Sequence, residues 1–246
     1  NGKTIVESLN GLVGDKDTIA VGSGYNVVAG GANEDGITVN GTTAAARGIV
    51  LGDNGKMIID TATGNLLSIE STEFSGGAKD TINLTAGTNA IVGGQGDDTI
   101  TAGSGANTIL GDDGRATFFT NGDLNTIEST NLGNGGNDTI SLQAGTNAVI
   151  GGAGADSITA TTGSNTILGD EGRAELFADG TLKLITSTNL GIGGVDKITL
   201  TDGVNSVIAG FGDDVINIKA GTNFVFGDEG KREVFTSGAD NGKTIV

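Results

Sequence analysis

The sequence predicts an all-β fold, a parallel β-roll or β-solenoid built from nonapeptide half-turns. Aspartate and asparagine alternate along much of the chain at a strict spacing of nine residues. A large apolar residue follows two positions after nearly every one of them, and several of its neighbours are Thr or Val, as strands prefer. No stretch sustains the periodicity of about 3.6 residues that an amphipathic helix requires.

Nine residues are enough for one glycine-rich turn and one short strand, so two such steps make one coil of 18 residues. Each strand is then expected to pair in parallel with the strand one coil away, at about 4.8 Å. Inward Ile and Val side chains would stack into a thin core that no single coil could bury alone. Aspartate falls on one edge of this solenoid and asparagine on the other.

The composition narrows the chemistry. The chain has 246 residues, 46 of them Gly, and it contains no Pro, Cys, His or Trp. Thiolate or imidazole metal sites and Cys- or His-based nucleophilic catalysis are therefore excluded, and the lack of Pro suits uninterrupted strand pairing. A net charge of −17 argues against nucleic acid and anionic membranes and suits hard cations. No apolar run is long enough for a transmembrane helix.

The nine-residue ladder returns in four groups along the chain. The first group is incomplete, and the other three each contain two aspartates and two asparagines. The members are Asp17, Asn26 and Asp35; Asp80, Asn89, Asp98 and Asn107; Asp138, Asn147, Asp156 and Asn165; and Asp196, Asn205, Asp214 and Asn223.

A longer repeat contains these groups. The phrase Leu-Gly-Asp begins at Leu51, Leu110 and Leu168, and Phe226 begins a fourth copy, at spacings of 59, 58 and 58 residues. The hexapeptide NGKTIV occupies residues 1–6 and again 241–246, a period of 240. We therefore expect a single continuous solenoid over 1–246, with units at about 1–50 (joined cyclically with 226–246), 51–109, 110–167 and 168–225, and tandem copies in the parent protein.

The segment after each Leu-Gly-Asp phrase has two interpretations. Asn121-Gly122 and Asp179-Gly180 lie between apolar runs, which is a signal for a β-hairpin. Alternatively, each of these segments forms a third, wider coil of its unit of about 58 residues. Aspartate and asparagine edges would then continue to alternate as far as Asp138. We favour the wider coil, which predicts three coils a unit and twelve coils in four units.

The stretch Gly93–Thr101, GGQGDDTIT, reads G-G-x-G-x-D-x-U-x, where U is a large apolar residue. Gly151–Thr159 matches this pattern at every position, and Ala209–Asn217 misses only the first Gly. On these residues the chain resembles the RTX (haemolysin-type) calcium-binding β-roll repeats of large secreted bacterial surface proteins of the adhesin type. The copies at 133–141 and 191–199 lack the second Gly, and those around Asp17 and Asp35 are the most degraded.

The resemblance implies several Ca²⁺ ions along the aspartate edge, held by sixth-position carboxylates and by carbonyl oxygens of the glycine-rich turns. Calcium independently suits such a site, because it takes about six to eight oxygen ligands in flexible geometry. The expected metal-site residues are Asp17, Asp35, Asp80, Asp98, Asp138, Asp156, Asp196 and Asp214, with Gly93, Gly94, Gly96, Gly151, Gly152, Gly154, Gly210 and Gly212.

The aspartates of the Leu-Gly-Asp phrases have two possible roles. They would lie one coil beyond a sixth-position aspartate, where they could close a second calcium site in each unit, or they could form simple Asp turns. These residues are Asp53, Asp112, Asp170 and Asp228.

The asparagine edge departs from the family pattern. Amide oxygens are neutral and are poorer calcium ligands than carboxylates, so we expect stacked amides that hydrogen-bond along the coils. The sequence therefore predicts calcium on one edge only.

The expected function is a calcium-stabilised structural module of an extracellular bacterial fibre, surface layer or giant adhesin, assembling end to end with copies of itself. We expect no enzyme activity, because the paired acids all lie in the calcium rungs, and no nucleic-acid partner or membrane insertion. Two alternatives are an ice- or glycan-binding face, with pairs such as Thr88-Asn89 and Thr146-Asn147, and a secretion or folding module of an RTX-like toxin or protease.

Overall fold

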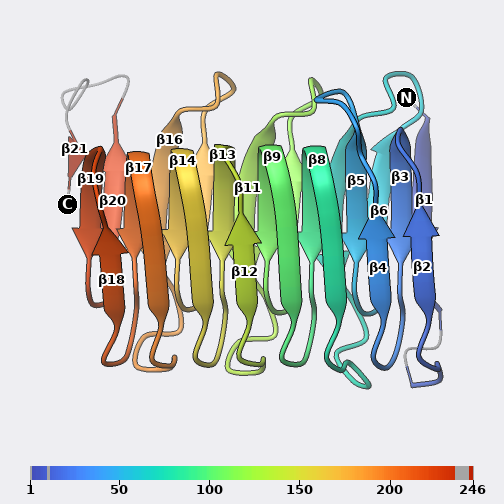
Figure 1. The fold of residues 1–246 in the computed structure, drawn as a ribbon, viewed down its shortest axis with the longest axis horizontal. Coiled ribbons are helices and arrows are strands. Elements are labelled where there is room, and N and C mark those ends of the chain that lie inside the picture. The colour runs from blue at the N-terminus through green and yellow to red at the C-terminus, as the bar shows by residue number, and fades with distance from the viewer. Residues whose placement is uncertain (1, 10–11, 236–243, 246) are drawn as a thin grey trace.

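The computed structural model describes residues 2–9, 12–235 and 244–245, and this part of the chain contains strands and no helix. It accordingly holds no helix long and apolar enough to cross a membrane. The strands run across the long axis of the molecule and form one parallel and one antiparallel sheet (Figure 1). The predicted all-β parallel roll is confirmed for the first of these sheets.

The parallel sheet is a stack of eight coils within the described residues. Coils 3, 4, 6 and 7 are each one bent strand of 12 residues: β8 (Thr81–Val92), β9 (Thr99–Leu110), β14 (Ser157–Leu168) and β17 (Lys197–Ile208). The others are split in two, as β2 (Thr18–Val21) with β3 (Tyr25–Ala29), β4 (Gly36–Val39) with β5 (Arg47–Leu51), β12 (Thr139–Leu142) with β13 (Gly145–Ile150), and β18 (Val215–Ile218) with β19 (Thr222–Phe226), forming coils 1, 2, 5 and 8.

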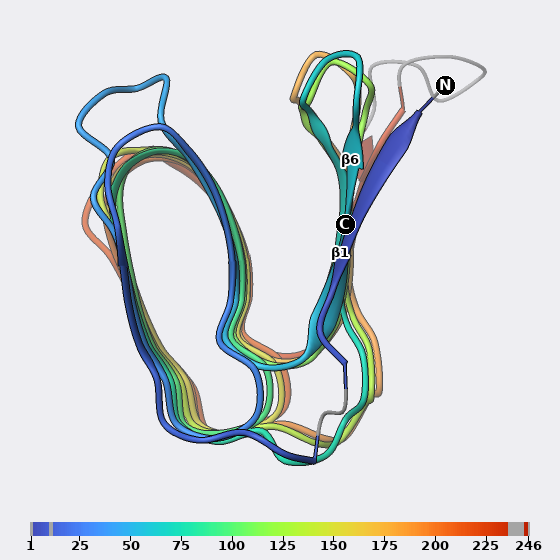
Figure 2. The same cartoon turned by 90° about the vertical axis from the view of Figure 1, so that its right-hand side faces the viewer.

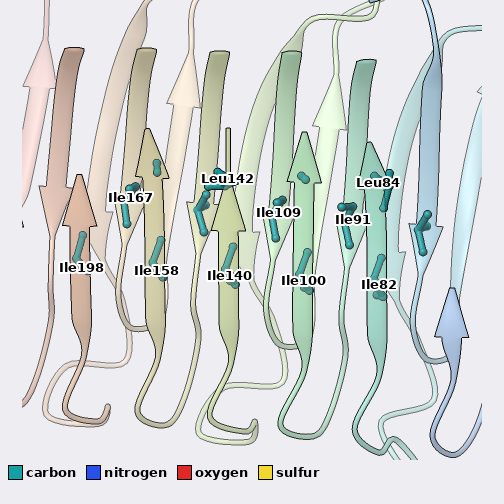
Figure 3. Packing of buried hydrophobic residues seen from close by; sticks show 14 of the residues in the cluster. Ile82, Leu84, Ile91, Ile100, Ile109, Ile140, Leu142, Ile158, Ile167 and Ile198 are labelled. Carbon is teal, nitrogen blue, oxygen red and sulfur yellow. The ribbon is translucent and has the colours of Figure 1, made fainter. Parts of the chain in front are cut away.

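Adjacent coils pair in register, so identical positions of the nonapeptide form straight columns. Ile82 pairs with Ile100, and Ile100 pairs with Ile140, which places isoleucine above isoleucine in the core (Figure 3). Full burial of each such side chain contributes about 1.5–3 kcal/mol. The column comprises Ile19, Ile37, Ile82, Ile100, Ile140, Ile158, Ile198 and Ile216.

The segments after the Leu-Gly-Asp phrases form β-hairpins, so the prediction of a wider third coil, and of twelve coils, is wrong. The hairpins are β6 (Gly55–Asp60) with β7 (Leu66–Ser71), β10 (Gly114–Phe118) with β11 (Leu124–Ser129), β15 (Gly172–Leu176) with β16 (Leu182–Ser187), and β20 (Lys231–Val234) with β21 (Thr244–Ile245). Together with β1 (Lys3–Glu7) they form one antiparallel sheet of nine strands.

Local chemistry and pairing across units both favour the hairpin. Gly122 has a φ of 95°, and its backbone amide donates to the Phe119 carbonyl, which closes the loop. Ala116 is buried between the more exposed Arg115 and Thr117, which is the two-residue alternation of a strand. Each hairpin also pairs with the next one, for example β7 with β10, so the backbone groups on both sides of a hairpin are satisfied.

The inner face of the hairpin sheet packs against the second halves of the coils. Met57, Ile69 and Ile127 from the hairpins join Leu51 and Leu110 from the coils in a second core. Viewed along the long axis, the coils superimpose as one outline and the hairpins form a second arm (Figure 2). A groove of about 750 Å³ lies between the two arms and is lined by residues such as Thr88, Thr146, Phe118, Phe177 and Leu182.

Candidate metal centre

The sixth-position aspartates form one continuous column. The backbone amide of Asp80 donates to Oδ1 of Asp98 over 2.7 Å, and the amide of Asp98 donates to Oδ1 of Asp138 over 2.8 Å. The same contact joins every neighbouring pair in the series Asp17, Asp35, Asp80, Asp98, Asp138, Asp156, Asp196 and Asp214. Each carboxylate is thereby fixed beside the turn of the preceding coil.

The second carboxylate oxygen of this column has no hydrogen-bond partner although it is buried. Such an oxygen is costly, because burial removes its water and nothing in the chain replaces it. Seven consecutive members share the property: Oδ2 of Asp35, Asp80, Asp98, Asp138, Asp156, Asp196 and Asp214. Because the same unpartnered oxygen recurs at one position of the nonapeptide, it indicates a binding site for a cation along this column.

Backbone carbonyls converge on the same places. A Cβ atom added to Gly93 would lie 2.3 Å from Oδ2 of Asp98 and 2.2 Å from the carbonyl oxygen of Gly111. A Cβ added to Gly151 would likewise lie 2.3 Å from Oδ2 of Asp156 and 2.2 Å from the Gly169 carbonyl. Each first-position glycine thus leaves room between a carboxylate of its own turn and a carbonyl of the next coil.

This all-oxygen environment fits calcium, which binds carboxylates and backbone carbonyls together. Among the described residues no three acidic side chains gather around one point. A cation in this column would therefore need the carbonyl oxygens as well as the aspartates, which is the arrangement that the glycine-rich turn provides.

Burial makes the column electrostatically unfavourable without a cation. It raises the pKa of Asp80 and of Asp138 to about 7 and that of Asp196 to about 8. For Asp98 and Asp156, burial followed by repulsion from Asp138 raises the pKa well above the usual range of a carboxyl group. A bound divalent cation offsets both causes, because opposite charge favours the ionised form.

The aspartates of the three Leu-Gly-Asp phrases and of Phe226-Gly227-Asp228, which we call the latch aspartates (Asp53, Asp112, Asp170 and Asp228), are not members of the column, and the first three bind backbone amides of other turns. Asp112 accepts a backbone hydrogen bond from Gly136 over 2.9 Å and another from Ala153 over 2.6 Å. It therefore joins the turns of the next two coils to its own. Burial raises its pKa to about 9.

Asp170 repeats this contact, Asp53 repeats part of it, and Asp228 differs. Asp170 accepts from the amides of Gly194 and Phe211, whereas Asp53 accepts through Oδ2 from the amide of Gln95 and its buried Oδ1 has no hydrogen-bond partner. In Asp112 and Asp170, backbone N–H groups thus occupy both carboxylate oxygens that a second calcium site would need, which favours a structural role for these two residues. Asp228 is exposed.

The glycines expected in the metal site serve three different purposes. The first-position residues leave room beside the column, as described for Gly93 and Gly151. The second-position residues lie against latch aspartates, since a Cβ on Gly94, Gly152 or Gly210 would lie 2.2–2.4 Å from Oδ2 of Asp53, Asp112 or Asp170. The fourth-position residues Gly96, Gly154 and Gly212 lie against the backbone of the preceding coil.

Sequence reasoning missed one set of contributors, the glycines of the Leu-Gly-Asp phrases. The carbonyls of Gly52, Gly111 and Gly169 face the carboxylate column just as those of the nonapeptide glycines do. Their position could have been found from spacing alone, because Gly111 follows Gly93 by 18 residues, one full coil. Indeed Gly94 donates its amide to the Gly111 carbonyl.

The predicted asparagine ladder is confirmed. Nδ2 of Asn89 donates to Oδ1 of Asn107 over 2.8 Å, and Asn107 donates in the same way to Asn147 over 2.9 Å. The contacts continue through Asn165, Asn205 and Asn223. In coil 2 this position is Gly48, whose backbone amide donates to Asn89 instead.

Replacing one rung of this ladder should destabilise the fold. Asn107→Ala would leave Nδ2 of Asn89 and Oδ1 of Asn147 buried without these partners, at about 1–3 kcal/mol for each group. We expect a loss of about 2–6 kcal/mol in the free energy of unfolding, measured by denaturant titration in calcium. Asn217→Ala, on an exposed side chain of coil 8, is the control and should be nearly neutral. Equal losses in both variants would contradict the ladder.

Comparison with known protein families agrees with this site. A family model described as the RTX calcium-binding nonapeptide repeat matches four times, at residues 83–118, 132–158, 150–173 and 190–225. No curated protein and no solved structure matches the chain. The matched segments contain Asp98, Asp138, Asp156, Asp196 and Asp214, with the turns that precede them. The chain therefore contains RTX calcium-binding nonapeptide repeats, which occupy the matched segments between residues 83 and 225.

Proposed function

We propose that this chain is a calcium-stabilised structural module of an extracellular bacterial fibre, surface layer or giant adhesin, and that it associates end to end with copies of itself. The column of seven buried, unpartnered carboxylate oxygens carries the proposal. Such a column is unstable as an anion and becomes a source of stability when cations bind to it, because binding to the folded state alone favours folding.

The assignment of metal ligands follows the two kinds of aspartate. The column aspartates, from Asp17 to Asp214, supply carboxylate oxygens, and the glycine-rich turns supply carbonyls. Asp53, Asp112 and Asp170 hold successive turns together through backbone amides. Calcium then lies on the aspartate edge alone, since the amides of the other edge are hydrogen-bonded to one another.

An extracellular location suits a calcium-dependent fold that contains no cysteine, because bound ions take over the stabilising role that disulfides often have there. The regular repeat supports a structural role over a catalytic one: the buried acids recur at every coil rather than at one place. A secretion or folding module of a toxin or protease would use the same calcium chemistry beside a separate domain.

The ice- or glycan-binding alternative has less support from the geometry. The asparagine side chains needed for such a face are buried in their ladder, for example Asn89 and Asn147. The outward column beside them mixes Thr88, Ala106 and Val204, so it presents no uniform row of hydroxyl groups.

Calorimetric titration of the calcium-free chain with Ca²⁺ tests the proposal. Asp98→Asn should lower the number of ions bound or weaken their affinity about tenfold, a change of about 1.4 kcal/mol, because a carboxylate ligand becomes a neutral amide. Asp97→Asn is the matched control: it lies in the same turn and is exposed, so calcium binding should be unchanged. No calcium binding by the native chain, or identical titrations for both variants, would refute the proposal.

A further inference from the structure

We infer that a second copy of this chain stacks on the first in one defined register, with coil 8 of one copy paired in parallel with coil 1 of the next. This inference rests on the proposed function and adds to it the residues and the alignment of the junction. Three features of the chain agree with the same alignment.

The repeated hexapeptide is the first feature. Thr244-Ile245 in β21 repeats Thr4-Ile5 in β1. Strand β21 pairs antiparallel with β20, with Val234 opposite Thr244 and Glu233 opposite Ile245. The chain therefore shows directly how the β1 sequence binds β20. In the described sheet β1 pairs on one side only, with β6, whereas β20 pairs with β16 on one side and with β21 on the other; at the junction, β1 of the following copy would take the place on β20 that β21 occupies here.

The register of the coils is the second feature. With a period of 240, Val215 of coil 8 precedes Thr18 of the next copy by 43 residues, and Thr222 precedes Tyr25 by 43 as well. Across the second and third hairpins, from coil 4 to coil 5 and from coil 6 to coil 7, the shift is 40 in both halves of the coil, whereas across the first hairpin it is 45 in one half and 41 in the other. Equal shifts in both halves keep the whole coil in register, and the three additional residues lie in the sequence between coil 8 and the next coil 1.

The faces that this register brings together are chemically matched. Ile216 would lie on Ile19 and extend the isoleucine column without interruption. Val225, which is 44% exposed, would lie on Val28 of the next copy. The amide of Asp214 would donate to the Asp17 carboxylate, as every other column amide does to the carboxylate of the next coil.

The latch aspartates are the third feature. Asp112 and Asp170 each reach 24 and 41 residues ahead, to Gly136 and Ala153 and to Gly194 and Phe211. With the same three additional residues, Asp228 would reach the amides of Asp15 and Ala32 in the next copy. These are the same two turn positions, so the exposed Asp228 is a latch whose partners belong to the following copy.

Chemical cross-linking between introduced cysteines tests the register. The sequence contains no native cysteine, so only the introduced residues can react. Thr222→Cys and Tyr25→Cys chains, mixed in calcium, should be joined by a short bis-maleimide into heterodimers, since the two exposed positions would be adjacent. Thr222→Cys mixed with Thr18→Cys is the control, because Thr18 lies in the other half of coil 1 and should give no product. Equal yields from both mixtures would overturn the inference.

If separate chains associate too weakly to be cross-linked, a single polypeptide that contains two copies at the 240-residue period tests the same junction. Thr222→Cys in its first copy and Tyr25→Cys in its second should cross-link within the chain at any concentration. Failure there overturns the junction. In the mixing experiment, Asp228→Asn should weaken association about tenfold, corresponding to about 1.4 kcal/mol for a lost charged hydrogen bond, whereas Asp123→Asn at a hairpin tip should not.

Circular dichroism of the same samples separates the two proposals. A chain that folds in calcium but does not cross-link in register remains a calcium-stabilised module and refutes only the junction. A chain whose fold is indifferent to calcium refutes the proposed function, whatever its state of association.

Discussion

Without calcium at about pH 9 the chain is expected to be largely unfolded, and millimolar calcium should restore its strand signal. Burial raises the pKa of Asp80, Asp138 and Asp170 to about 7, of Asp53 and Asp196 to about 8, and of Asp112 to about 9. A carboxyl whose pKa rises from about 3.9 to about 7 costs the fold on the order of 4 kcal/mol when ionised. Since ordinary domains are stable by about 5–15 kcal/mol, a few such groups suffice to unfold the chain.

The sign of the pH dependence distinguishes this mechanism from a general effect of charge. Because the folded carboxyl groups hold protons that the unfolded chain releases, the calcium-free fold binds more protons and gains stability as the pH falls. That stability is fully present below about pH 4, the unfolded value, and is lost as the pH rises through about 7 to 9. Calcium should therefore matter most at alkaline pH and least in acid.

Thermal unfolding followed by circular dichroism at about pH 5 and about pH 9, after dialysis against a chelating resin and again with calcium, checks this expectation. Magnesium is the control cation and should restore less structure, because it demands a tight octahedron of ligands. A calcium-free chain that is equally stable at both pH values would contradict the role assigned to the column.

Gly152→Ala should be among the most damaging single substitutions in the chain. Gly152 has a φ of 122°, which disfavours any residue with a Cβ atom, at about 1–2 kcal/mol. The added Cβ would also lie 2.3 Å from Oδ2 of Asp112, where it would displace the carboxylate from the Ala153 amide. Displacing a buried carboxylate costs several kcal/mol more, so we expect Gly152→Ala to lower the free energy of unfolding by about 3–5 kcal/mol in total.

Gly31→Ala isolates the backbone contribution. Gly31 occupies the same turn position with a φ of 110°, but a Cβ there would meet nothing within 4 Å. Gly31→Ala should therefore lower the free energy of unfolding only by the conformational cost of the positive φ, about 1–2 kcal/mol. Denaturant titrations of the two variants in calcium give the difference, and a difference near zero would show that the latch of Asp112 contributes nothing.

The repeat itself was predictable from the sequence. A spacing of nine with one acidic or amide residue and one apolar residue admits few folds, and the coils, the isoleucine column and the ladder from Asn89 to Asn223 all follow from it. Every contact involved joins equivalent positions of neighbouring repeats, so a local pattern determines it.

The hairpins could not be decided in the same way. Asn121-Gly122 suits a hairpin loop and an edge turn equally well, because both need a residue with positive φ. The hairpin is favoured by contacts with another unit: Ala116 pairs with Ile69, and Arg115 forms an ion pair with Glu70. A linear pattern does not show contacts between segments so far apart.

For a related reason, the sequence did not show which backbone amides the latch aspartates bind. An aspartate before glycine suggests a turn that binds its own backbone, yet Asp112 binds amides 24 and 41 residues ahead. Only the stacking of coils in three dimensions brings those amides near. The partners proposed for the exposed Asp228 in a following copy come from the same spacings of 24 and 41 residues.

Both ladders are polar, and this limits the symmetry of any end-to-end assembly. The column amides from Asp17 to Asp196 and the ladder amides from Asn89 to Asn205 donate toward the coil that follows, as Asp80 does to Asp98 and Asn89 does to Asn107. By the same direction, coil 8 presents the amide of Asp214 at its end, and coil 1 presents the carboxylate of Asp17. Two identical ends would oppose donors to donors or carboxylates to carboxylates, so a closed twofold dimer is disfavoured. Contacts between unlike ends repeat by translation without closing, and such heterologous contacts generate filaments of open length.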